Sequence, residues 1–306
     1  MFKEKFKEGI ISAKKFDKGD IEEILNKGEQ MTKINTSDIL KGKILATLFF
    51  EPSTRTRLSF ESAMYRLGGN IIGFTSGKVS SIKKGESIAD TIRTVENYCD
   101  CIVMRHPLEG AAELASRFAS IPIINAGSGS GEHPTQALLD LLTMKMECGQ
   151  LDGLNIGIMG DLKYGRTVHS LSYLLSNFDV NIYFISPKEL RIRNREKEYL
   201  IHEKGINFKE ITNYRNVLDT LDILYMTRIQ KERFADMEEY EKVKNVYVFK
   251  KKDLSKTKDN FKLMHPLPRI TEIKPNVDES KKAIYFKQTR YGLHLRKALL
   301  AELMAD

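Results

Sequence analysis

The sequence predicts an α/β protein built from two Rossmann-like domains, each with a central parallel sheet flanked by helices. Its 306 residues are enough for two cores of ordinary size. Short apolar runs alternate along the chain with segments in which apolar residues recur at helical spacing. Most of these runs are continuously apolar, which is typical of parallel strands covered on both faces.

The apolar runs and helical spacings also give the order of the elements. Strands are predicted at residues 44–50, 71–75, 101–105, 121–125, 155–160, 181–185, 223–227, 246–249 and 262–264. Helices are predicted at residues 20–27, 54–67, 86–98, 110–118, 134–147, 167–178 and 293–304. Asp20 and Glu23 are spaced as a capping box in the first of these helices. Such alternation implies right-handed crossovers between strands.

A domain boundary is expected near residues 148–153, where a long predicted helix ends and Gly149 and Gly153 bracket a turn. We therefore expect one domain at residues 1–148 and a second at residues 149–289. The last helix, at about residues 290–306, is expected to return to the first domain, as such tails often do in two-domain α/β enzymes.

The composition limits the classes of partner. A hydrophobic content of 41% with 29% charged residues is typical of a soluble globular protein, and every apolar run is far shorter than a membrane span. Residues 1–16 mix acids and bases, unlike a signal peptide, so we expect a cytoplasmic protein. The net charge of +8 suits an anionic small substrate. Nucleic acid is not expected, because the lysines are scattered and the lysines at 250–252 have no aromatic residue among them.

The cysteines and the absence of metal motifs favour a reduced protein without cofactors. Cys99, Cys101 and Cys148 are an odd number of thiols in a long chain, which argues against a disulfide framework. Cys99 and Cys101 lack zinc spacing, and no other His-rich or carboxylate-rich metal motif is present in the sequence. We expect neither a metal nor another cofactor.

The most informative stretch runs from Phe49 to Phe60, where an apolar strand leads into a helix. The segment Ser53-Thr54-Arg55-Thr56 stands where that helix begins. The first N–H groups of a helix have no intrahelical partner and its dipole favours an anion, so hydroxyls and arginines at this point predict a phosphate site. The alternative is an ordinary serine N-cap followed by solvated arginines.

Other polar residues follow other predicted strands, at the sheet edge where α/β proteins bind ligands. Together with Arg55 they predict a cleft between the domains for a substrate with several negative charges; they are Arg105, His133, Arg166 and Arg228. Each has a structural alternative. His133 could simply start a helix before Pro134, His265 could be a core residue, and Lys84 could be a solvated loop residue.

Seven motifs occur together along the chain: FFEPSTRTRLSFESAMYRLG, VSSIKKGES, IVMRHPLEGAA, NAGSGSGEHPTQALLDL, GDLKYGRTVHSL, DILYMTRIQKER and HPLPR. In order and spacing they resemble the motifs of the aspartate carbamoyltransferase family, over nearly the whole chain. The resemblance implies transfer of the carbamoyl group of carbamoyl phosphate to the amine of L-aspartate, giving N-carbamoyl-L-aspartate and phosphate, in pyrimidine biosynthesis. Neither a metal nor a covalent intermediate is implied, so catalysis would depend on proximity and preorganised donors.

The resemblance also implies a role for each matching residue. The carbamoyl phosphate site would comprise Ser53, Thr54, Arg55, Thr56, Ser80, Lys84, Arg105, His133, Gln136, Leu267 and Pro268. The catalytic residues would be Arg55, Thr56, Lys84, Arg105 and His133. Thr56, Arg105 and His133 would donate to the carbonyl oxygen. Gln136 would accept from the carbamoyl NH₂, while Leu267 would offer its carbonyl and Pro268 would shape the loop.

For aspartate, the resemblance implies contacts from Lys84, Arg166, Arg228, Gln230 and Leu267, with the arginines binding carboxylates bidentately. Glu51 would bridge to Arg166 and Arg233 when the domains close over both substrates. Ser80 and Lys84 match a loop that reaches into the active site of a neighbouring subunit, which implies a homotrimer with shared sites. Whether regulatory chains also bind is left open.

Three other functions are alternatives to this one. Ornithine carbamoyltransferase shares the phosphate motif, but the sequence has neither the Ser-Met-Gly loop nor the His-Cys-Leu-Pro segment expected of it. A catalytically silent homologue would have lost a phosphate or oxyanion ligand, and the sequence retains them all. A nucleic-acid-binding protein would carry a recognisable module. One departure from the family is Ser128, where many members have an acidic residue, and it puts the stability of that loop in question.

Overall fold

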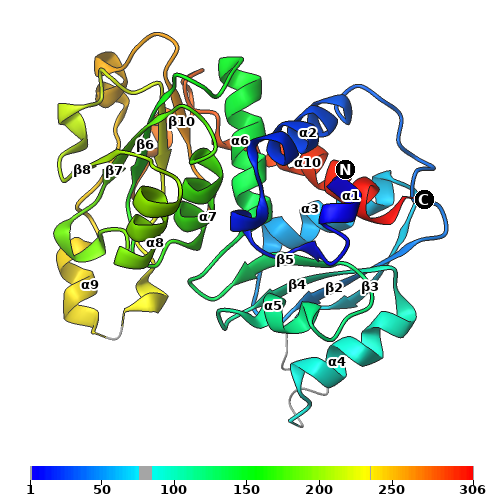
Figure 1. The fold of residues 1–306 in the computed structure, drawn as a ribbon. Helices are drawn as coiled ribbons and strands as arrows, with labels where there is room; N and C mark the ends of the chain where they lie inside the picture. The colour runs from blue at the N-terminus through cyan, green and yellow to red at the C-terminus, as the bar shows by residue number, and fades with distance from the viewer. Residues whose placement is uncertain (1, 76–84, 235, 306) are drawn as a thin grey trace. The chain divides into compact units, whose positions relative to one another are not determined.

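The computed structural model describes residues 2–75, 85–234 and 236–305 (Figure 1). The chain forms two compact units, residues 1–142 with 289–306 and residues 143–288. It passes from one unit to the other within helices α6 (Pro134–Cys148) and α10 (Tyr285–Met304). None of the helices in the described ranges has an apolar stretch long enough to cross a bilayer.

The sheet of the first unit is parallel, as the continuously apolar runs predict. Its strands are β1 (Gly9–Ile10), β2 (Ile44–Phe49), β3 (Asn70–Phe74), β4 (Cys101–His106) and β5 (Ile123–Ser128). They are ordered β1-β5-β4-β2-β3, and every neighbouring pair is parallel. Buried Cys101 opens β4 and faces inward, as expected.

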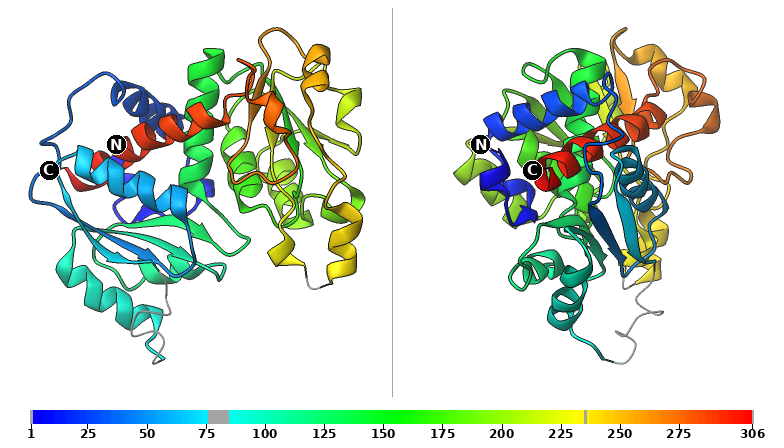
Figure 2. Two further views of the ribbon diagram at one scale, coloured as in Figure 1. Left: turned by 180° about the vertical axis from the view of Figure 1, so that it is seen from behind. Right: turned by 90° about the vertical axis from the view of Figure 1, so that its right-hand side faces the viewer.

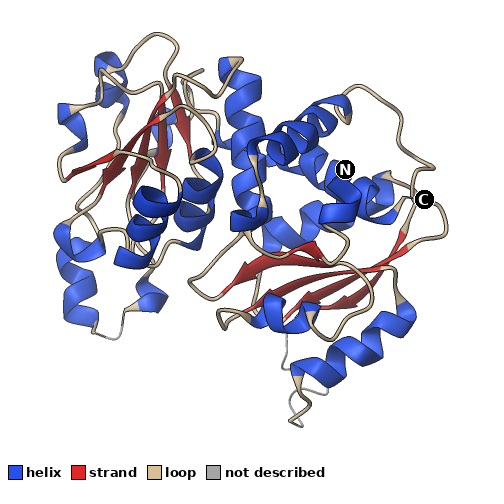
Figure 3. Ribbon diagram, viewed as in Figure 1, coloured by secondary structure: helices blue, strands red, loops and turns tan. Residues whose placement is uncertain are grey.

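Helices cover both faces of this sheet (Figure 3). Helices α3 (Thr54–Arg66) and α10 lie over one face, and α4 (Ile88–Val95) and α5 (Ala111–Ser116) lie over the other. Alternate strand residues point to each face. Those facing α4 and α5 pack with the helices in one buried cluster that includes Ala46, Leu48, Ile92, Ile102, Met104 and Ala112. The unit also contains α1 (Phe2–Lys5) and α2 (Lys18–Gln30).

The C-terminal helix packs with the N-terminal part of the chain (Figure 2). Arg296 donates from Nη1 to the Ser59 hydroxyl at 2.7 Å and stacks over the ring of Phe60 on α3. Lys27 on α2 pairs with Glu302 at 2.6 Å. These contacts place residues 289–306 with the first unit, although nearly 150 residues of the second unit separate them in sequence.

The second unit has its own parallel sheet. Its strands are β6 (Asn155–Met159), β7 (Asn181–Ile185), β8 (Phe208–Ile211), β9 (Ile223–Met226) and β10 (Lys262–Met264), ordered β10-β9-β6-β7-β8. The α-helices of this unit are α7 (Arg166–Leu175), α8 (Asn194–Glu198) and α9 (Met237–Val243). Short 3₁₀ helices of the chain lie at Ala13–Lys15, Glu96–Tyr98, Lys188–Leu190, Tyr214–Asn216, Lys231–Arg233, Lys251–Lys256 and Pro275–Val277, and a π-helical turn lies at Tyr199–Glu203.

Each sheet has one point at which the strand order reverses. In the first sheet β2 has β3 on one side and β4 on the other, so the reversal lies between β2 and β4. In the second sheet the reversal lies between β6 and β9. Ligands of open α/β sheets bind outside the carboxyl ends of the strands at such points. The residues following β2, β4, β6 and β9 are therefore the ones to examine for a site.

Several predicted elements differ from those observed. The first long helix spans Lys18–Gln30, and its capping box is formed by Asp17 and Asp20 rather than by Asp20 and Glu23. Residues 246–249 do not form a strand; only Phe249 makes an isolated bridge, to Ile273. The last helix begins at Tyr285, well before the first predicted residue. Strands β1 and β8 were not predicted, because β1 has two residues and β8, at the sheet edge, is partly polar.

The observed capping box gives a prediction. Asp17 and Asp20 each accept the other's backbone N–H at 2.9 Å, so Asp17→Ala should lower the free energy of unfolding by about 1 kcal/mol. Lys5 holds the pKa of Asp17 down at about 2, so this contribution is present above about pH 4 and is lost as the pH falls toward 2. Urea unfolding at neutral pH measures the loss. Glu23→Ala, which removes a part-buried i,i+4 pair with Lys27, should cost less than about 0.5 kcal/mol, and equal losses would contradict the assignment.

Candidate functional site

The N-terminus of α3 lies directly after β2, where the sequence predicts an anion site. Ser53 is the N-cap residue, with an extended backbone (φ −156°, ψ 103°). No cap hydrogen bond forms between its hydroxyl and the N–H groups of residues 54–66, all of which are described. The hydroxyl instead accepts from Nη1 of Arg105 at 3.2 Å. This arrangement argues against the simple serine-cap alternative, because the Ser53 hydroxyl does not cap the first N–H groups of α3.

Arg105 joins the ends of the two strands that flank the reversal point. It is paired in register with Phe49 of β2, and its carbonyl accepts from the N–H of Phe50 at 2.9 Å. Its Nε donates to Oε1 of Glu51 at 2.7 Å. The two side chains are only 16% and 20% exposed, so this ion pair is screened less than a surface pair. Arg105 therefore ties residues 50–53 to the end of β4.

His133 brings a second helix N-terminus to the same place. It stands just before Pro134, the first residue of α6, and is 3% exposed. Its Nε2 lies 3.5 Å from Oγ1 of Thr56, in the first turn of α3, and its Nδ1 lies 3.5 Å from Oγ1 of Thr135. The dipoles of α3 and α6 therefore both favour negative charge at this edge of the sheet.

The loop from β5 to α6 that carries His133 is held by several hydrogen bonds. Buried Ser128 accepts from the side chain of Asn125 at 3.3 Å, and its backbone pairs with Glu132. Glu132 in turn accepts from the Ser12 hydroxyl at 2.6 Å and from the Ala13 N–H at 2.7 Å. The serine at 128 thus takes part in the hydrogen bonds of this loop.

Gln136 lies in the first turn of α6 and is 9% exposed. Its Nε2 donates at 2.9 Å to Oδ1 of Asp140, which is fully buried one turn further along the helix. Buried Arg296 of α10 is close enough for the charge of Asp140 to act on it: burial lowers the pKa of Arg296 to about 10, and Asp140 opposes that shift. Asp140 was not predicted, although its i+4 spacing from Gln136 was a usable signal.

A second group of predicted residues lies at the carboxyl ends of β6 and β9. Arg166 is the first residue of α7, after the N-cap Gly165. Asp161, two residues past β6, accepts from the N–H groups of Tyr164 at 2.9 Å and Gln230 at 3.4 Å. The Gln230 side chain donates to the Tyr164 carbonyl at 3.1 Å. These bonds join the loop after β6 to the loop after β9.

Arg228, which follows β9, is paired with a carboxylate four residues on. Its guanidinium binds both oxygens of Glu232, with 3.0 Å between Nη1 and Oε2. The hydrogen bonds that Arg228 donates to Glu232 raise the pKa of Arg228. Burial acts to raise the pKa of Glu232, but the bond from Arg228 outweighs it and lowers that pKa. Glu232 and the predicted Arg233 share one 3₁₀ helix. Glu232 was missed, because Arg228 lies in a loop and no regular helical spacing marks the pair in the sequence.

Leu267 and Pro268 lie in the loop after β10, joined by a cis peptide bond, with φ +57° at Leu267. The Leu267 N–H donates to Nδ1 of His265 at 2.8 Å, so the ring proton is on Nε2, which donates to Glu272 at 2.9 Å. Burial acts to raise the pKa of Glu272, but the bond from His265 outweighs it and lowers that pKa. His265 is thus a buried residue that shapes the Leu267 loop, in agreement with the core interpretation.

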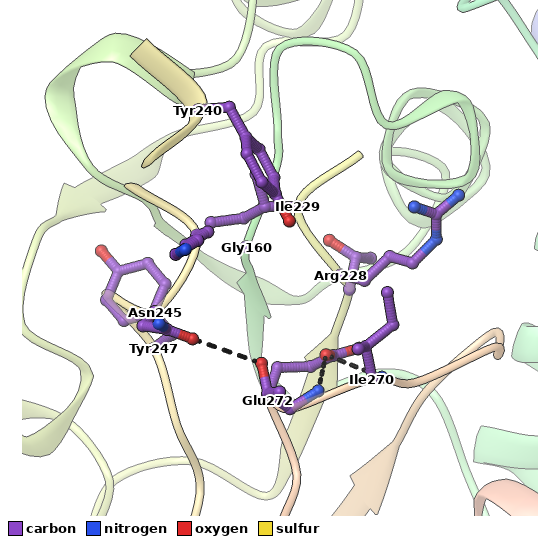
Figure 4. Close-up of a pocket in the computed structure, with 11 residues that line it drawn as sticks. Gly160, Arg228, Ile229, Tyr240, Asn245, Tyr247, Ile270 and Glu272 are labelled. Atoms are coloured by element: carbon purple, nitrogen blue, oxygen red, sulfur yellow. Dashed lines mark hydrogen bonds between the residues drawn. The ribbon is translucent and has the colours of Figure 1, made fainter. Parts of the chain in front are cut away.

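A pocket of about 210 Å³ lies beside this second group, lined in part by Gly160, Arg228, Tyr240, Asn245, Tyr247 and Glu272 (Figure 4). Gly160 has φ +126°, and a Cβ there would lie 2.3 Å from the Thr227 carbonyl oxygen, so only glycine fits. The Arg228 guanidinium points away from Asn245 and Tyr247. The pocket therefore lies next to, and not around, the group expected to bind a carboxylate.

The predicted residues thus fall into two groups, one in each unit. The first unit holds Glu51, Ser53, Thr54, Arg55, Thr56, Arg105, His133 and Gln136, and the second holds Arg166, Arg228, Gln230, Arg233, Leu267 and Pro268. Ser80 and Lys84 lie outside the described residues. The bridge from Glu51 to Arg166 and Arg233 would join the two units and stays a prediction. Across the described ranges, no three His, Cys, Asp or Glu side chains gather as a metal site would require.

Comparisons with known protein families match both units. Residues 9–146 match the family described as aspartate/ornithine carbamoyltransferase, carbamoyl-P binding domain, and residues 152–303 match its Asp/Orn binding domain. The chain is 55% identical over 295 residues to the aspartate carbamoyltransferase catalytic subunit of Thermococcus gammatolerans, covering 95% of this chain and 96% of that one. It is 53% identical over 302 residues to the catalytic subunit of Methanocaldococcus jannaschii, covering 97% and 98%.

Solved structures agree. An aspartate transcarbamoylase from Trypanosoma cruzi, in complex with carbamoyl aspartate and phosphate, superposes with a TM-score of 0.93 at 40% identity, covering 99% of this chain and 98% of that one. The catalytic subunit of M. jannaschii aspartate transcarbamoylase gives a TM-score of 0.88 at 53% identity and 97% coverage of both chains. The resemblance seen in the seven motifs is therefore confirmed: the chain belongs to the aspartate/ornithine carbamoyltransferase family, among the aspartate carbamoyltransferases.

Proposed function

We propose that this protein transfers the carbamoyl group of carbamoyl phosphate to the amine of L-aspartate, giving N-carbamoyl-L-aspartate and phosphate. The observation that carries the proposal is the meeting of two helix N-termini, at Ser53 and His133, beside Arg105 at the reversal point of the first sheet. The relatives whose names and bound ligands specify this reaction support it. In the cell we place it in pyrimidine biosynthesis and in the cytoplasm, where its three free thiols would stay reduced.

Carbamoyl phosphate would bind to the first unit. Its phosphate would accept from the N–H groups and hydroxyls of residues 53–56, with Arg55 supplying a guanidinium. The carbonyl oxygen would face Thr56, Arg105 and His133. When the amine nitrogen attacks the carbonyl carbon, this oxygen gains negative charge, and preorganised donors stabilise that charge without reorganising. The bond from carbon to the phosphate oxygen then breaks, and phosphate leaves.

Aspartate would bind to the second unit. Arg166 and Arg228 would each hold a carboxylate, with Gln230 beside them and the Leu267 carbonyl accepting from the amine. In this scheme Glu232 fixes the Arg228 guanidinium before the substrate arrives, because both of its oxygens already bind that group. Closure of the two domains over both substrates would move Glu51 toward Arg166 and Arg233.

The enzyme is further proposed to be a homotrimer whose sites are shared between subunits. What supports this is the match of VSSIKKGES to the family loop that crosses to a neighbour, carrying Ser80 and Lys84. The relatives are named catalytic subunits, which is consistent with regulatory chains as additional partners.

The activity itself is tested by supplying carbamoyl phosphate with L-aspartate or with L-ornithine. Carbamoyl aspartate should form and citrulline should not. Arg105→Ala should lower kcat/KM by about 10³-fold, since it removes a donor to the developing charge. Arg66→Ala is the matched control, because Arg66 lies exposed at the C-terminal end of α3, where its Nε donates to the Ser62 hydroxyl at 3.3 Å; it should retain full activity. Citrulline formation, or an active Arg105→Ala enzyme with an unchanged melting temperature, would contradict the assignment.

Sharing of sites is tested by mixing two inactive variants, Arg105→Ala and Lys84→Ala, after dissociation and reassembly. If each site takes Arg105 from one subunit and Lys84 from its neighbour, random mixed trimers regain roughly a quarter of their sites. Each variant reassembled alone serves as the control and should stay inactive. Recovery of no activity from mixed trimers, verified by their sedimentation, would show that both residues serve the site of one chain.

Asp161 gives the second unit a pH-dependent stability. Burial raises its pKa to about 6, although backbone N–H groups and Arg228 oppose the shift. In the unfolded chain the group loses its proton near pH 3.8. Between these values the folded state binds more protons, so the wild-type protein loses stability as the pH rises.

Asp161→Asn should therefore gain stability relative to the wild type as the pH rises, by about 2 kcal/mol between about pH 4 and pH 7. The amide oxygen can still accept from the Tyr164 N–H, so the loop bond is retained. Urea unfolding of both proteins across this range gives the difference. A difference that does not change with pH, or one that shrinks as the pH rises, would show that Asp161 ionises normally.

A further inference from the structure

We propose that Asp140 is a positioning residue that fixes the side-chain amide of Gln136, so that its oxygen faces the carbamoyl NH₂ and the site selects carbamoyl phosphate over acyl phosphates without that group. The inference deepens the proposed function and rests on its placement of carbamoyl phosphate beside α6. It assigns a task to a buried carboxylate that the chemistry does not otherwise use.

The geometry begins with one hydrogen bond between two turns of α6. Nε2 of Gln136 donates to Oδ1 of Asp140 at 2.9 Å. Asp140 is fully buried and Gln136 is 9% exposed, so water competes little for this bond. The Gln136 side chain therefore has its nitrogen end directed along the helix toward Asp140.

A glutamine amide presents a donor at one end and an acceptor at the other, and a carboxylate only accepts. With Nε2 held by Asp140, Oε1 is the end left for a ligand. Turning the amide over would place its oxygen against the buried carboxylate and its NH₂ against the NH₂ of the substrate, leaving two unsatisfied contacts. One buried anion thus sets which end of the amide the substrate meets.

Arg296 places a positive charge near Asp140. Burial lowers the pKa of Arg296 to about 10 and the charge of Asp140 opposes that shift, so Arg296 stays protonated at neutral pH, and a neighbouring cation favours the ionised form of a carboxylate. The guanidinium is itself held by the Ser59 hydroxyl at 2.7 Å and by the ring of Phe60, 4.9 Å from its carbon. Through Arg296 and Asp140, helix α10 therefore helps to hold the side-chain amide of Gln136 in this orientation.

The test compares carbamoyl phosphate with acetyl phosphate, in which a methyl group replaces the NH₂. Equilibrium binding of both, measured by calorimetry without aspartate, gives the ratio of the two Kd values. In Asp140→Asn the new amide can pair with either end of Gln136, so the preference for carbamoyl phosphate should fall about tenfold, through weaker binding of carbamoyl phosphate alone.

Gln136→Met should lose the same preference, and the double variant Gln136→Met/Asp140→Asn should lose no more than Gln136→Met does, because Asp140 acts through Gln136. Additive losses, or an unchanged ratio in Asp140→Asn, would overturn the proposal. If Asp140→Asn fails to fold, Asp140→Asn/Arg296→Gln, which removes the buried cation with its anion, takes its place in the comparison. Binding needs no turnover. A wild-type protein that binds carbamoyl phosphate but makes no carbamoyl aspartate would refute the proposed function, whereas the ratio of the two Kd values would still test the role of Asp140.

Discussion

The rest of the site depends on how Arg105 is held at the end of β4. Its pairing with Glu51 and its bond to Ser53 fix the segment between β2 and α3, and that segment sets where the first turn of α3 points. His133 then meets Thr56 because the two helices start at the same sheet edge. A parallel sheet with a reversal between β2 and β4 supplies the edge, and the partly buried ion pair specifies the local path of the chain.

The sequence could predict the fold because the signals were of two independent kinds that agreed. Continuously apolar runs marked most strands of both sheets, and hydroxyl and arginine residues after those runs marked the ligand-binding edge. Strands β1 and β8 were not predicted, because β1 has only two residues and β8 is partly exposed, so neither shows a periodic pattern of apolar residues. The capping box was misplaced because Asp17, Asp20 and Glu23 offer two overlapping spacings, and the pairing of Lys5 with both Asp17 and Asp20 is a contact that the local spacing does not reveal.

The supporting residues of the site were harder to find than the ligands. Asp140, Glu232 and Glu272 carry no motif chemistry of their own, and each acts by holding a neighbour: Gln136, Arg228 and His265. An i+4 pair on a helix is common on any solvated surface, so spacing alone does not distinguish a functional pair from a surface pair. Burial distinguishes them, and burial depends on contacts with distant segments such as α10.

The split course of the first unit has a consequence for how the protein is made. During synthesis the whole of residues 143–288 emerges before Arg296 and the rest of the C-terminal helix. The unit that begins the chain is therefore the last to be completed. Its helices α2 and α3 contact α10, which is synthesised only after the whole of the second unit. A nascent chain would spend that interval with the surfaces of α2 and α3 that contact α10 still uncovered.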